Sequence, residues 1–334
     1  MRTVTAALRF GVLGCAEIAW RRTLPSLVSC EDARLVVVAS RDADKAARFA
    51  SRFGCEAAHG YESVLERDDV DAVYLPLPTG LHREWCAKAL RAGKHVLVEK
   101  PVAVDHQEAL ELATLAERHG VALLENRGFA HHTQHDAVRK LVADGVIGEL
   151  RGFTSTMGIP PPPRHDVRHR ADLGGGALLD VGYYPVSAAQ LFVHQDLRVL
   201  GAHLVRDDET GVDVSGEALL VSPNGVPAHL SFGMRHAYRT HYELWGSKGR
   251  IVLERPFSAP DHWQPVVRLE RQDRSEQLTL PPCAQFTALF RAFATAVRSD
   301  PAHRAAHLDP SVRAAALLTA IRDHSTSTGT GDLR

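Results

Sequence analysis

The first 125 residues alternate short apolar runs with helix-like stretches, and this alternation restricts the possible folds more than any other feature of the chain. Strands that alternate with helices form a parallel sheet with helices on both faces. Runs such as VVVA and VLV lack polar alternation, which is typical of strands buried on both faces. The apolar runs lie at 9–13, 35–39, 72–75, 95–98 and 121–125, and the helix-like stretches lie at 18–28, 44–53, 82–92 and 106–119.

The pattern changes after residue 126. A glycine run at 174–176 opens an apolar helix, and strand-like runs then fill 197–280 without long helices between them. Such a succession predicts a mostly antiparallel sheet. Helices are expected again at 286–298 and 311–323. The predicted fold is therefore α/β with two domains, at 1–126 and 127–325, followed by a polar tail at 326–334 that frays.

Composition excludes several classes of protein. A formal net charge of -1 argues against a large nucleic-acid-binding surface. No apolar run is long enough to span a membrane, and the first residues do not have the pattern of a signal peptide. The five cysteines are scattered and form no CxxC, so neither a disulfide framework nor a zinc site is predicted. These features lead us to expect a cytoplasmic protein.

A glycine-containing loop follows the first predicted strand and opens a helix. Glycines at this point let the backbone turn tightly and approach a pyrophosphate, which the helix N-terminus attracts. The best register of the dinucleotide fingerprint starts at Gly14 and has Ala16 in place of its middle glycine, a departure from G-x-G-x-x-G. The residues predicted to contact the dinucleotide here are Gly11, Gly14, Cys15, Ala16, Glu17 and Ile18.

The end of the second predicted strand selects the dinucleotide. NAD sites place an acidic residue there, whereas NADP sites favour an arginine that binds the 2′-phosphate. The strand ends in Ser40 and Arg41, and a hydroxyl followed by a guanidinium suits a phosphate. Asp42 follows and is interpreted as the cap of the next helix. The sequence therefore predicts NADP (as NADPH), with Arg41 as an ordinary surface residue as the alternative.

Three segments together resemble one oxidoreductase family. They are GVLGCAEIA, the stretch that ends in GKHVLVEKP, and GGGALLDVGYYPV. Over about residues 8–320 the chain resembles the Gfo/Idh/MocA family, and GKHVLVEKP is the most specific part. The resemblance implies a Rossmann domain, a C-terminal α/β domain with an open-faced, mostly antiparallel sheet, and a nicotinamide crevice between them. It also implies a homodimer or homotetramer formed through that sheet.

The resemblance implies roles for individual residues. Lys100 matches the active-site lysine of the family, and Asp180 and Tyr184 match positions on the helix after the glycine run. Many members have histidine where this chain has Tyr184, which favours a Tyr/Lys pair over proton transfer by histidine. The remaining cofactor-binding residues that the resemblance implies are Pro78, Thr79, Leu81, His82 and Glu99.

The chemistry of a Tyr184/Lys100 pair is consistent on its own terms. Hydride addition to a ketone builds negative charge on oxygen, so a proton donor must lie beside that oxygen. A phenol has a pKa near 10, and a nearby ammonium stabilises the phenolate. We therefore predict Tyr184 as the acid and Lys100 as its electrostatic partner. Asp180 is predicted to orient Lys100 or to bind a sugar hydroxyl, and Asp180 and Tyr184 are both expected to contact the substrate. Tyr183 is the alternative acid, because neighbouring positions on a helix point about 100° apart.

Histidines and arginines supply the candidate substrate contacts. His131 and His135 have the spacing of a helical metal pair, but no third ligand is near in sequence and no metal is predicted. His131 is assigned to the sugar pocket by the resemblance. Cations that could bind a diphosphate are Arg164, Arg168, Arg170, Arg235 and Arg239, and the alternative for each is a solvated loop arginine.

The segments RFGVLGCAEIAWRRTLP, ENRGFAHHTQH and LGGGALLDVGYYPV carry a narrower resemblance. On them the chain is similar, within the family, to deoxysugar C-3 ketoreductases of the kijanose-pathway type, in antibiotic-sugar biosynthesis. The similarity implies NADPH-dependent reduction of the C-3 keto group of a dTDP-linked 3-keto-6-deoxyhexose, which carries a 4-keto group in some cases. One alternative is a dehydrogenase of free sugars or trans-dihydrodiols on the same scaffold. Another is a non-catalytic NADP-binding sensor.

Overall fold

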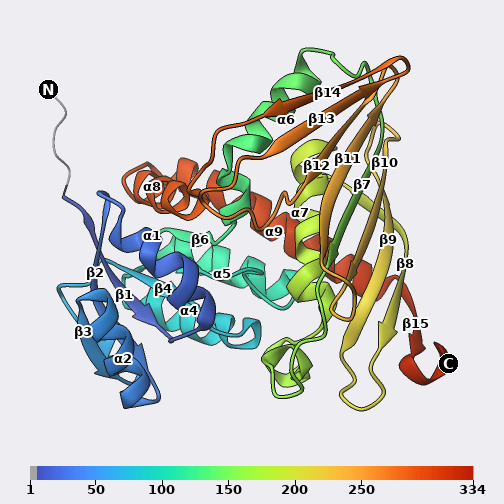
Figure 1. Cartoon of the computed structure of the whole chain (residues 1–334). Coiled ribbons are helices and arrows are strands. Elements are labelled where there is room, and N and C mark those ends of the chain that lie inside the picture. The colour runs from blue at the N-terminus through green and yellow to red at the C-terminus, as the bar shows by residue number, and fades with distance from the viewer. Residues whose placement is uncertain (1–5, 334) are drawn as a thin grey trace, which may run out of the picture. The chain divides into compact units, whose positions relative to one another are not determined.

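The computed structural model describes residues 6–333, which divide into two compact units (Figure 1). Of the described residues, the first unit contains 6–103, 107–131 and 284–312. The second contains 104–106, 132–283 and 313–333. The predicted division after residue 126 lies near the break at 131. Segment 284–312, which the sequence placed in the second domain, belongs to the first unit.

The first unit is built on a parallel six-stranded sheet of order β3-β2-β1-β4-β5-β6. This is the order of a doubly wound dinucleotide-binding sheet, so the predicted α/β fold of this part is confirmed. β3 was not predicted because its sequence, EAAH, is short and mostly exposed. The strands are β1 (Leu8–Leu13), β2 (Ala33–Ser40), β3 (Glu56–His59), β4 (Ala72–Leu75), β5 (His95–Val98) and β6 (Leu123–Glu125).

Helices cover this sheet. The stretch expected as one helix at 18–28 is a π-helical turn, η1 (Ala19–Thr23), followed by α1 (Leu24–Val28). The other helices and 3-10 turns are α2 (Ala43–Phe53), α3 (Glu62–Leu65), η2 (Thr79–Leu81), α4 (His82–Arg91), α5 (His106–His119), η3 (Gly128–His131) and α8 (Gln285–Val297).

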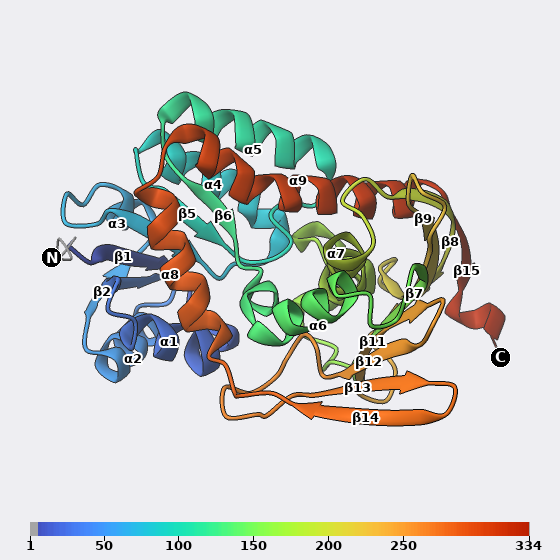
Figure 2. The same cartoon turned by 90° about the horizontal axis from the view of Figure 1, so that it is seen from above.

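Helix α8 completes the core of the first unit, although it comes from far along the chain. The ring of Phe10 on β1 contacts Phe290 and Phe293 of α8, each at a centroid distance of 5.5 Å. All three rings are fully buried. Burial of these aromatic side chains stabilises the attachment of α8 to the sheet, and Figure 2 shows α8 beside β1 and β6.

The second unit contains a nine-stranded sheet of order β14-β13-β12-β11-β7-β10-β9-β8-β15. Its pairs are antiparallel except for β7 with β10 and β8 with β15, so the predicted mostly antiparallel sheet is confirmed. The strands are β7 (Leu150–Gly158), β8 (Arg198–Arg206), β9 (Asp213–Val221), β10 (Pro227–Gly233), β11 (Arg239–Gly246), β12 (Arg250–Glu254), β13 (Val266–Arg271), β14 (Arg274–Thr279) and β15 (Ser325–Gly329).

One face of this sheet is covered by helix α7 (Tyr183–Phe192), which packs on β7, β10 and β11. The opposite face carries polar side chains, including Thr154 and His229. Among the described residues no helix packs on that face, and no helix is long and apolar enough to cross a membrane. The remaining elements are α6 (Thr133–Ala143), η4 (Val167–His169), η5 (Ala171–Leu173), η6 (Leu178–Gly182), η7 (Thr330–Leu333) and α9 (Pro301–Asp323), which has residues in both units.

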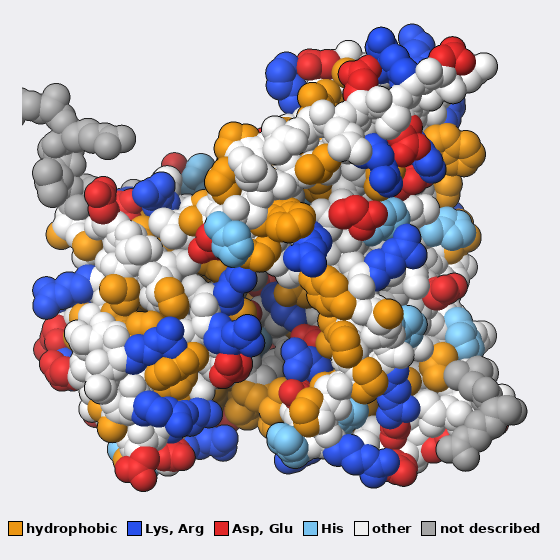
Figure 3. Space-filling view, in the orientation of Figure 1, with side chains coloured by type: hydrophobic (Ala, Val, Ile, Leu, Met, Phe, Trp, Pro, Cys, Tyr) orange, Lys and Arg blue, Asp and Glu red, His pale blue; other side chains and the backbone are white. Residues whose placement is uncertain are grey.

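Basic and acidic side chains alternate over the hairpin of β13 and β14, as Figure 3 shows. Arg268 pairs with Glu270 at 2.8 Å, and Arg271 pairs with Glu276 at 2.8 Å. Because opposite charges lie side by side, the hairpin presents no continuous field of one sign.

The C-terminal tail does not fray as expected. Residues Ser325–Gly329 form β15, which pairs in parallel with β8 and extends the sheet. The Asp208 carboxylate accepts bonds from the Thr330 hydroxyl and the Gly331 N–H, at 3.1 and 2.8 Å. The polar composition of the tail suggested fraying, but the edge of β8 offers backbone partners that composition does not reveal.

Candidate active site

The nucleotide loop lies at the carboxyl end of β1. Gly14 has a φ of 120°, and a Cβ there would lie 2.8 Å from the Leu77 side chain, so only glycine fits. Gly11 lies inside β1, where the missing side chain makes room for Val64 rather than for a ligand. The helix starts at Glu17, and Ile18 is 37% exposed. A tight glycine turn that leads into an exposed helix start fits a dinucleotide pyrophosphate.

The next three loop residues, Cys15, Ala16 and Glu17, differ in their exposure to solvent. Cys15 is buried, and burial raises the pKa of its thiol to about 11, which keeps the thiol neutral. Ala16 is partly exposed, and the exposed Glu17 carboxylate lies 3.8 Å from Arg21. The backbone N–H groups at the helix start, rather than the thiol, are therefore the candidate ligand contacts.

The end of β2 has the geometry expected for NADP. Ser40 is buried, and its hydroxyl accepts a bond from the Asp42 N–H at 3.1 Å. The Asp42 carboxylate accepts a bond from the Lys45 N–H at 3.1 Å and caps α2. Arg41 is exposed, and its guanidinium lies near the Tyr61 hydroxyl. The acidic residue that complicated the choice of cofactor is therefore occupied as a helix cap.

The loop after β4 is tied to the segment that carries Lys100. Pro78, Thr79 and Leu81 are partly exposed in and before η2, and His82 starts α4 in a buried position. Its ring nitrogens contact the Leu77 and Pro101 carbonyl oxygens at 2.8 and 2.9 Å. Burial lowers the pKa of His82 to about 4. His82 therefore fixes the backbone next to Lys100.

Glu99 and Lys100 follow β5, and both are partly buried. The Glu99 Oε1 accepts bonds from the Tyr74 hydroxyl at 2.5 Å and from the Asn126 amide at 2.6 Å. Sequence analysis missed Tyr74 and Asn126. A tyrosine inside the apolar run of β4 was the available signal, because a buried tyrosine hydroxyl needs a hydrogen-bond partner.

In the second unit, the glycine run leads into η6 and α7. Gly176 has a φ of 114°, and a Cβ there would lie 2.4 Å from the Asp213 carboxylate. That carboxylate accepts a bond from the Leu178 N–H at 2.5 Å and so anchors the start of the helix. Only glycine permits this approach, which explains the end of the glycine run.

The helix distinguishes the two adjacent tyrosines. Tyr183 is fully buried, whereas Tyr184 is partly exposed with its ring 5.3 Å from the Phe257 ring. A buried phenol cannot reach a ligand, so the geometry favours Tyr184 as the residue that meets the substrate. Lys100 lies in the first unit, and Tyr184 and Asp180 lie in the second.

The predicted diphosphate-binding arginines are mostly paired with carboxylates. Arg168 lies between Asp180, at 2.5 Å, and Asp166, at 3.1 Å. Arg168, a predicted substrate contact, is therefore paired with Asp180, the predicted orienting residue. The other pairs are Arg164 with Glu209, Arg170 with Asp172, and Arg235 with Asp207. Arg239 is exposed and makes no ion pair within the described chain.

The two histidines with metal-pair spacing lie in different units. His131 is partly exposed at the end of η3 in the first unit, and His135 is buried in the second. The His135 ring contacts the Tyr242 hydroxyl at 3.0 Å and the Pro256 carbonyl at 3.2 Å. Across residues 6–333 no group of three or more histidine, cysteine or acidic residues is arranged to hold a metal ion.

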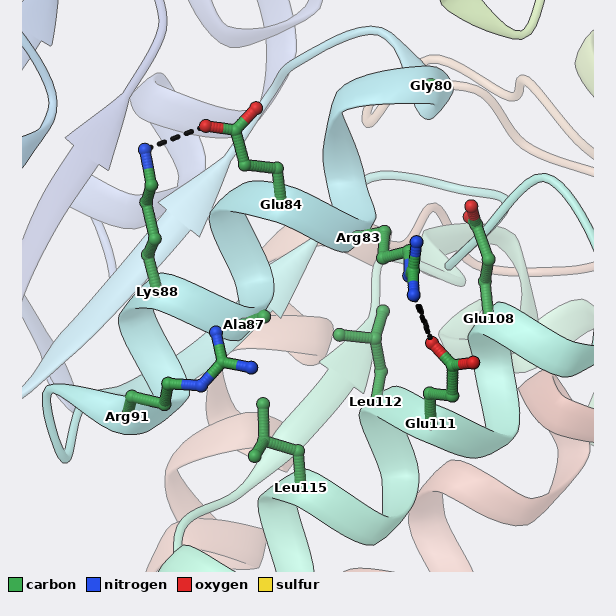
Figure 4. Close-up of a pocket in the computed structure, with 10 residues that line it drawn as sticks. All are labelled: Gly80, Arg83, Glu84, Ala87, Lys88, Arg91, Glu108, Glu111, Leu112 and Leu115. Carbon is green, nitrogen blue, oxygen red and sulfur yellow. Dashed lines mark hydrogen bonds and ion pairs between the residues drawn. The ribbon is translucent and has the colours of Figure 1, made fainter.

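A cavity of about 510 Å³ lies between α4 and α5 (Figure 4). Arg83 pairs there with Glu111 at 2.8 Å, and Lys88 pairs with Glu84 at 2.7 Å. No predicted cofactor residue lines this cavity. It is therefore separate from the candidate site at the carboxyl ends of the strands.

Comparison with protein families matches both units. The oxidoreductase family with an NAD-binding Rossmann fold matches residues 8–127, and the GFO/IDH/MocA C-terminal domain matches residues 135–252. The chain belongs to the Gfo/Idh/MocA oxidoreductase family. The resemblance predicted from the three sequence segments is therefore confirmed, as is the oxidoreductase class of the chain.

Members of this family with known activity are similar over nearly the whole chain. The dTDP-3,4-didehydro-2,6-dideoxy-alpha-D-glucose 3-reductase of Saccharopolyspora spinosa is 50% identical over 94% of this chain and 96% of its own. The enzyme of the same name from Actinomadura kijaniata is 50% identical over 94% and 95%, respectively.

A solved structure extends the similarity. The 3-ketoreductase from Actinomadura kijaniata in complex with NADP and TDP-benzene matches with a TM-score of 0.94 at 49% identity, over 97% of this chain and 99% of that chain. Variants of that ketoreductase with tyrosine replaced by phenylalanine, or lysine by alanine, have been solved with the same two ligands.

Proposed function

We propose that this protein uses NADPH to reduce the C-3 keto group of dTDP-3,4-didehydro-2,6-dideoxy-α-D-glucose or a close relative. The observation that carries the proposal is the 50% identity, over nearly the whole chain, with reductases of that sugar. The partly exposed Tyr184 and Lys100 supply the acid and cation that the reaction needs. We place the reaction in the biosynthesis of antibiotic deoxysugars, in the cytoplasm.

The chain's own residues account for the proton transfer. NADPH, when bound, supplies the hydride. The nucleotide loop at Gly14 and the exposed Arg41 would hold its pyrophosphate and 2′-phosphate. Tyr184 donates its hydroxyl proton to the oxygen at C-3, and the Lys100 ammonium stabilises the resulting phenolate. Asp180, held by Arg168 at 2.5 Å, orients the sugar or the lysine.

A comparison of substrates tests this function. We expect NADPH oxidation with the dTDP-linked 3-keto sugar to be far more efficient than with the free keto sugar, because binding of the diphosphate helps to position the ketone. Added salt should weaken substrate binding, since part of the attraction is between charges. The measurement is kcat/KM for each substrate at two ionic strengths. Equal efficiency with both forms would contradict the proposal and favour a dehydrogenase of free sugars.

We further infer a homodimer or homotetramer that forms through the uncovered face of the second unit's sheet. A groove of about 410 Å³ on this face is lined by outward side chains of β7, β9 and β10, including Thr154, Leu219 and His229. A second copy of the chain could pack on this open sheet face across a two-fold axis, with Leu219 as an apolar contact.

A charge placed on this face tests the assembly. Leu219→Arg is expected to shift the protein to a smaller species in sedimentation velocity, because like charges would meet across a symmetric interface. Leu110→Arg is the matched control, since Leu110 is 41% exposed on α5 of the first unit. Unchanged mass for Leu219→Arg, or a monomeric wild type, would contradict this interface.

A further inference from the structure

Inside the first unit, a chain of hydrogen bonds links η1, which follows the glycine loop, to Glu99, which precedes Lys100. The Thr23 hydroxyl, at the end of η1, donates to the Tyr74 hydroxyl oxygen at 2.9 Å. Tyr74 on β4 in turn donates to the Glu99 Oε1 at 2.5 Å. Asn126, just after β6, donates its amide to the same oxygen at 2.6 Å. Three segments that are separate in sequence are therefore linked by hydrogen bonds to one carboxylate, on the residue before Lys100.

Backbone bonds make this arrangement rigid. The Glu99 N–H donates to the Leu75 carbonyl at 3.1 Å, and the Asn126 N–H donates to the Val98 carbonyl at 2.7 Å. The Gly128 N–H donates to the Asn126 amide oxygen at 3.2 Å, which leaves the amide nitrogen to face Glu99. Tyr74 and Thr23 are fully buried, and Asn126 is 4% exposed. Buried donors with fixed rotamers hold their acceptor in one place.

The donors favour the ionised form of the carboxyl. Burial raises the pKa of Glu99, and the bonds from Tyr74 and Asn126, the Lys100 ammonium and the Lys100 N–H oppose that rise. Burial and the Glu99 charge hold the pKa of Tyr74 well above 10, so Tyr74 is always a donor. The net direction for the Glu99 pKa is upward, and the Lys100 ammonium, on the next residue, is the cation whose charge acts on this carboxyl.

We propose that Tyr74 and Asn126 are positioning residues that hold the Glu99 carboxylate beside Lys100, and that this carboxylate keeps Lys100 oriented as a charged ammonium. Thr23 does not contact Glu99; it acts indirectly, because its hydrogen bond orients the Tyr74 hydroxyl. The proposal rests on the role given above to Lys100 in the reduction. Tyr74, Asn126 and Thr23 lie outside the EKP residues and the glycine loop, and sequence analysis assigned them no role in the site.

The other titratable groups around this network are accounted for. His82 on α4 bonds to the Pro101 carbonyl, and its pKa, lowered to about 4 by burial, leaves it neutral above that pH. Glu125 on β6 accepts a bond from the Val102 N–H at 2.5 Å. The groups that act directly on the Glu99 carboxyl are therefore Tyr74, Asn126 and Lys100.

Titration of Glu99 in the protein without cofactor or substrate tests the network. The probe is the ¹³C signal of carboxyl-labelled glutamate, assigned with Glu99→Gln. Tyr74→Phe removes one bond to a charged group and should raise the Glu99 pKa by about one to two units. Asn126→Asp places a like charge there and should raise it more. Thr23→Val should raise it less, because it acts through Tyr74.

A matched control separates this effect from loss of stability. Tyr242→Phe deletes the hydroxyl of an equally buried tyrosine, which contacts His135 in the second unit. It should destabilise the fold to a similar degree and leave the Glu99 titration unchanged. An unchanged titration in folded Tyr74→Phe and Asn126→Asp proteins would overturn the proposal. If Tyr74→Phe does not fold, Thr23→Val and Asn126→Asp give the same comparison.

Kinetics then connect the network to turnover. A raised Glu99 pKa means that the carboxylate is lost at higher pH, so the acidic limb of the kcat profile should move upward by the same one to two units. The KM for the keto sugar should change little. In the Glu99→Gln background, Tyr74→Phe should have no further effect on the profile. Full turnover with an unmoved profile would overturn the positioning role and leave the proposed function intact.

The reverse outcome is also informative. A shifted Glu99 titration in a wild-type protein that does not reduce the keto sugar would support the network and overturn the proposed substrate. The two hypotheses therefore fail on different measurements.

Discussion

Replacement of Tyr184 by phenylalanine is expected to lower kcat for the keto sugar by about 10²–10⁴-fold, the range that general acid catalysis contributes. The substitution removes the proton donor and keeps the ring that packs against Phe257. NADPH affinity should remain nearly the same. Stopped-flow or steady-state measurement of NADPH oxidation gives kcat, and fluorescence titration gives the dissociation constant for NADPH.

The neighbouring tyrosine supplies the control. Tyr183 is fully buried, so Tyr183→Phe should affect thermal stability more than it affects kcat. A larger loss of turnover from Tyr183→Phe than from Tyr184→Phe would move the acid to Tyr183. Small losses from both would indicate that Lys100 or a bound water donates the proton.

Replacement of Arg41 by alanine is expected to weaken NADPH binding by about 10- to 150-fold and to leave NADH binding almost unchanged. A charge-assisted contact to phosphate contributes about 1.5–3 kcal/mol, which sets this range. Arg41 is exposed at the end of β2, and Asp42 beside it is engaged as a helix cap. The dissociation constants for both cofactors measure the preference directly.

Arg34→Ala is the matched control for Arg41, because Arg34 is also exposed and lies on β2, the strand that Arg41 follows. It removes the same charge from the same strand at a distance from the strand end. Its effect on NADPH binding should therefore be small. If the wild type binds NADPH and NADH equally, or if both substitutions weaken NADPH to the same extent, the assignment of Arg41 to the 2′-phosphate is wrong.

Local patterns predicted much of the first unit. The apolar runs that became β1, β2, β4, β5 and β6 are long enough and apolar enough to be recognised, and α5 spans 106–119 as expected. β3 was missed because an exposed edge strand has no apolar run. The tail was assigned wrongly because pairing with β8 depends on a distant strand edge, which composition does not encode.

The residues of the candidate site also include some that the sequence predicted and others that only the fold revealed. Gly14 and Lys100 were assigned from motifs in the sequence around them, and their roles in the site remain predictions. The ion pairs of Arg164, Arg168 and Arg235 could not be predicted, since the fold determines which carboxylate lies near each arginine. Glu99 was found through its motif, but the donors Tyr74 and Asn126 lie on other strands. Polar networks of this kind join residues that are distant in sequence, so only the fold reveals them.

The attachment of α8 to the sheet has a consequence for synthesis of the protein. Phe290 and Phe293, which pack on Phe10, leave the ribosome long after the six strands of the first unit have been made. During that interval the nascent sheet lacks part of its aromatic core and exposes apolar surface. We expect a fragment that ends at residue 131 to aggregate, and the emerging chain to engage a chaperone until about residue 312 has been translated.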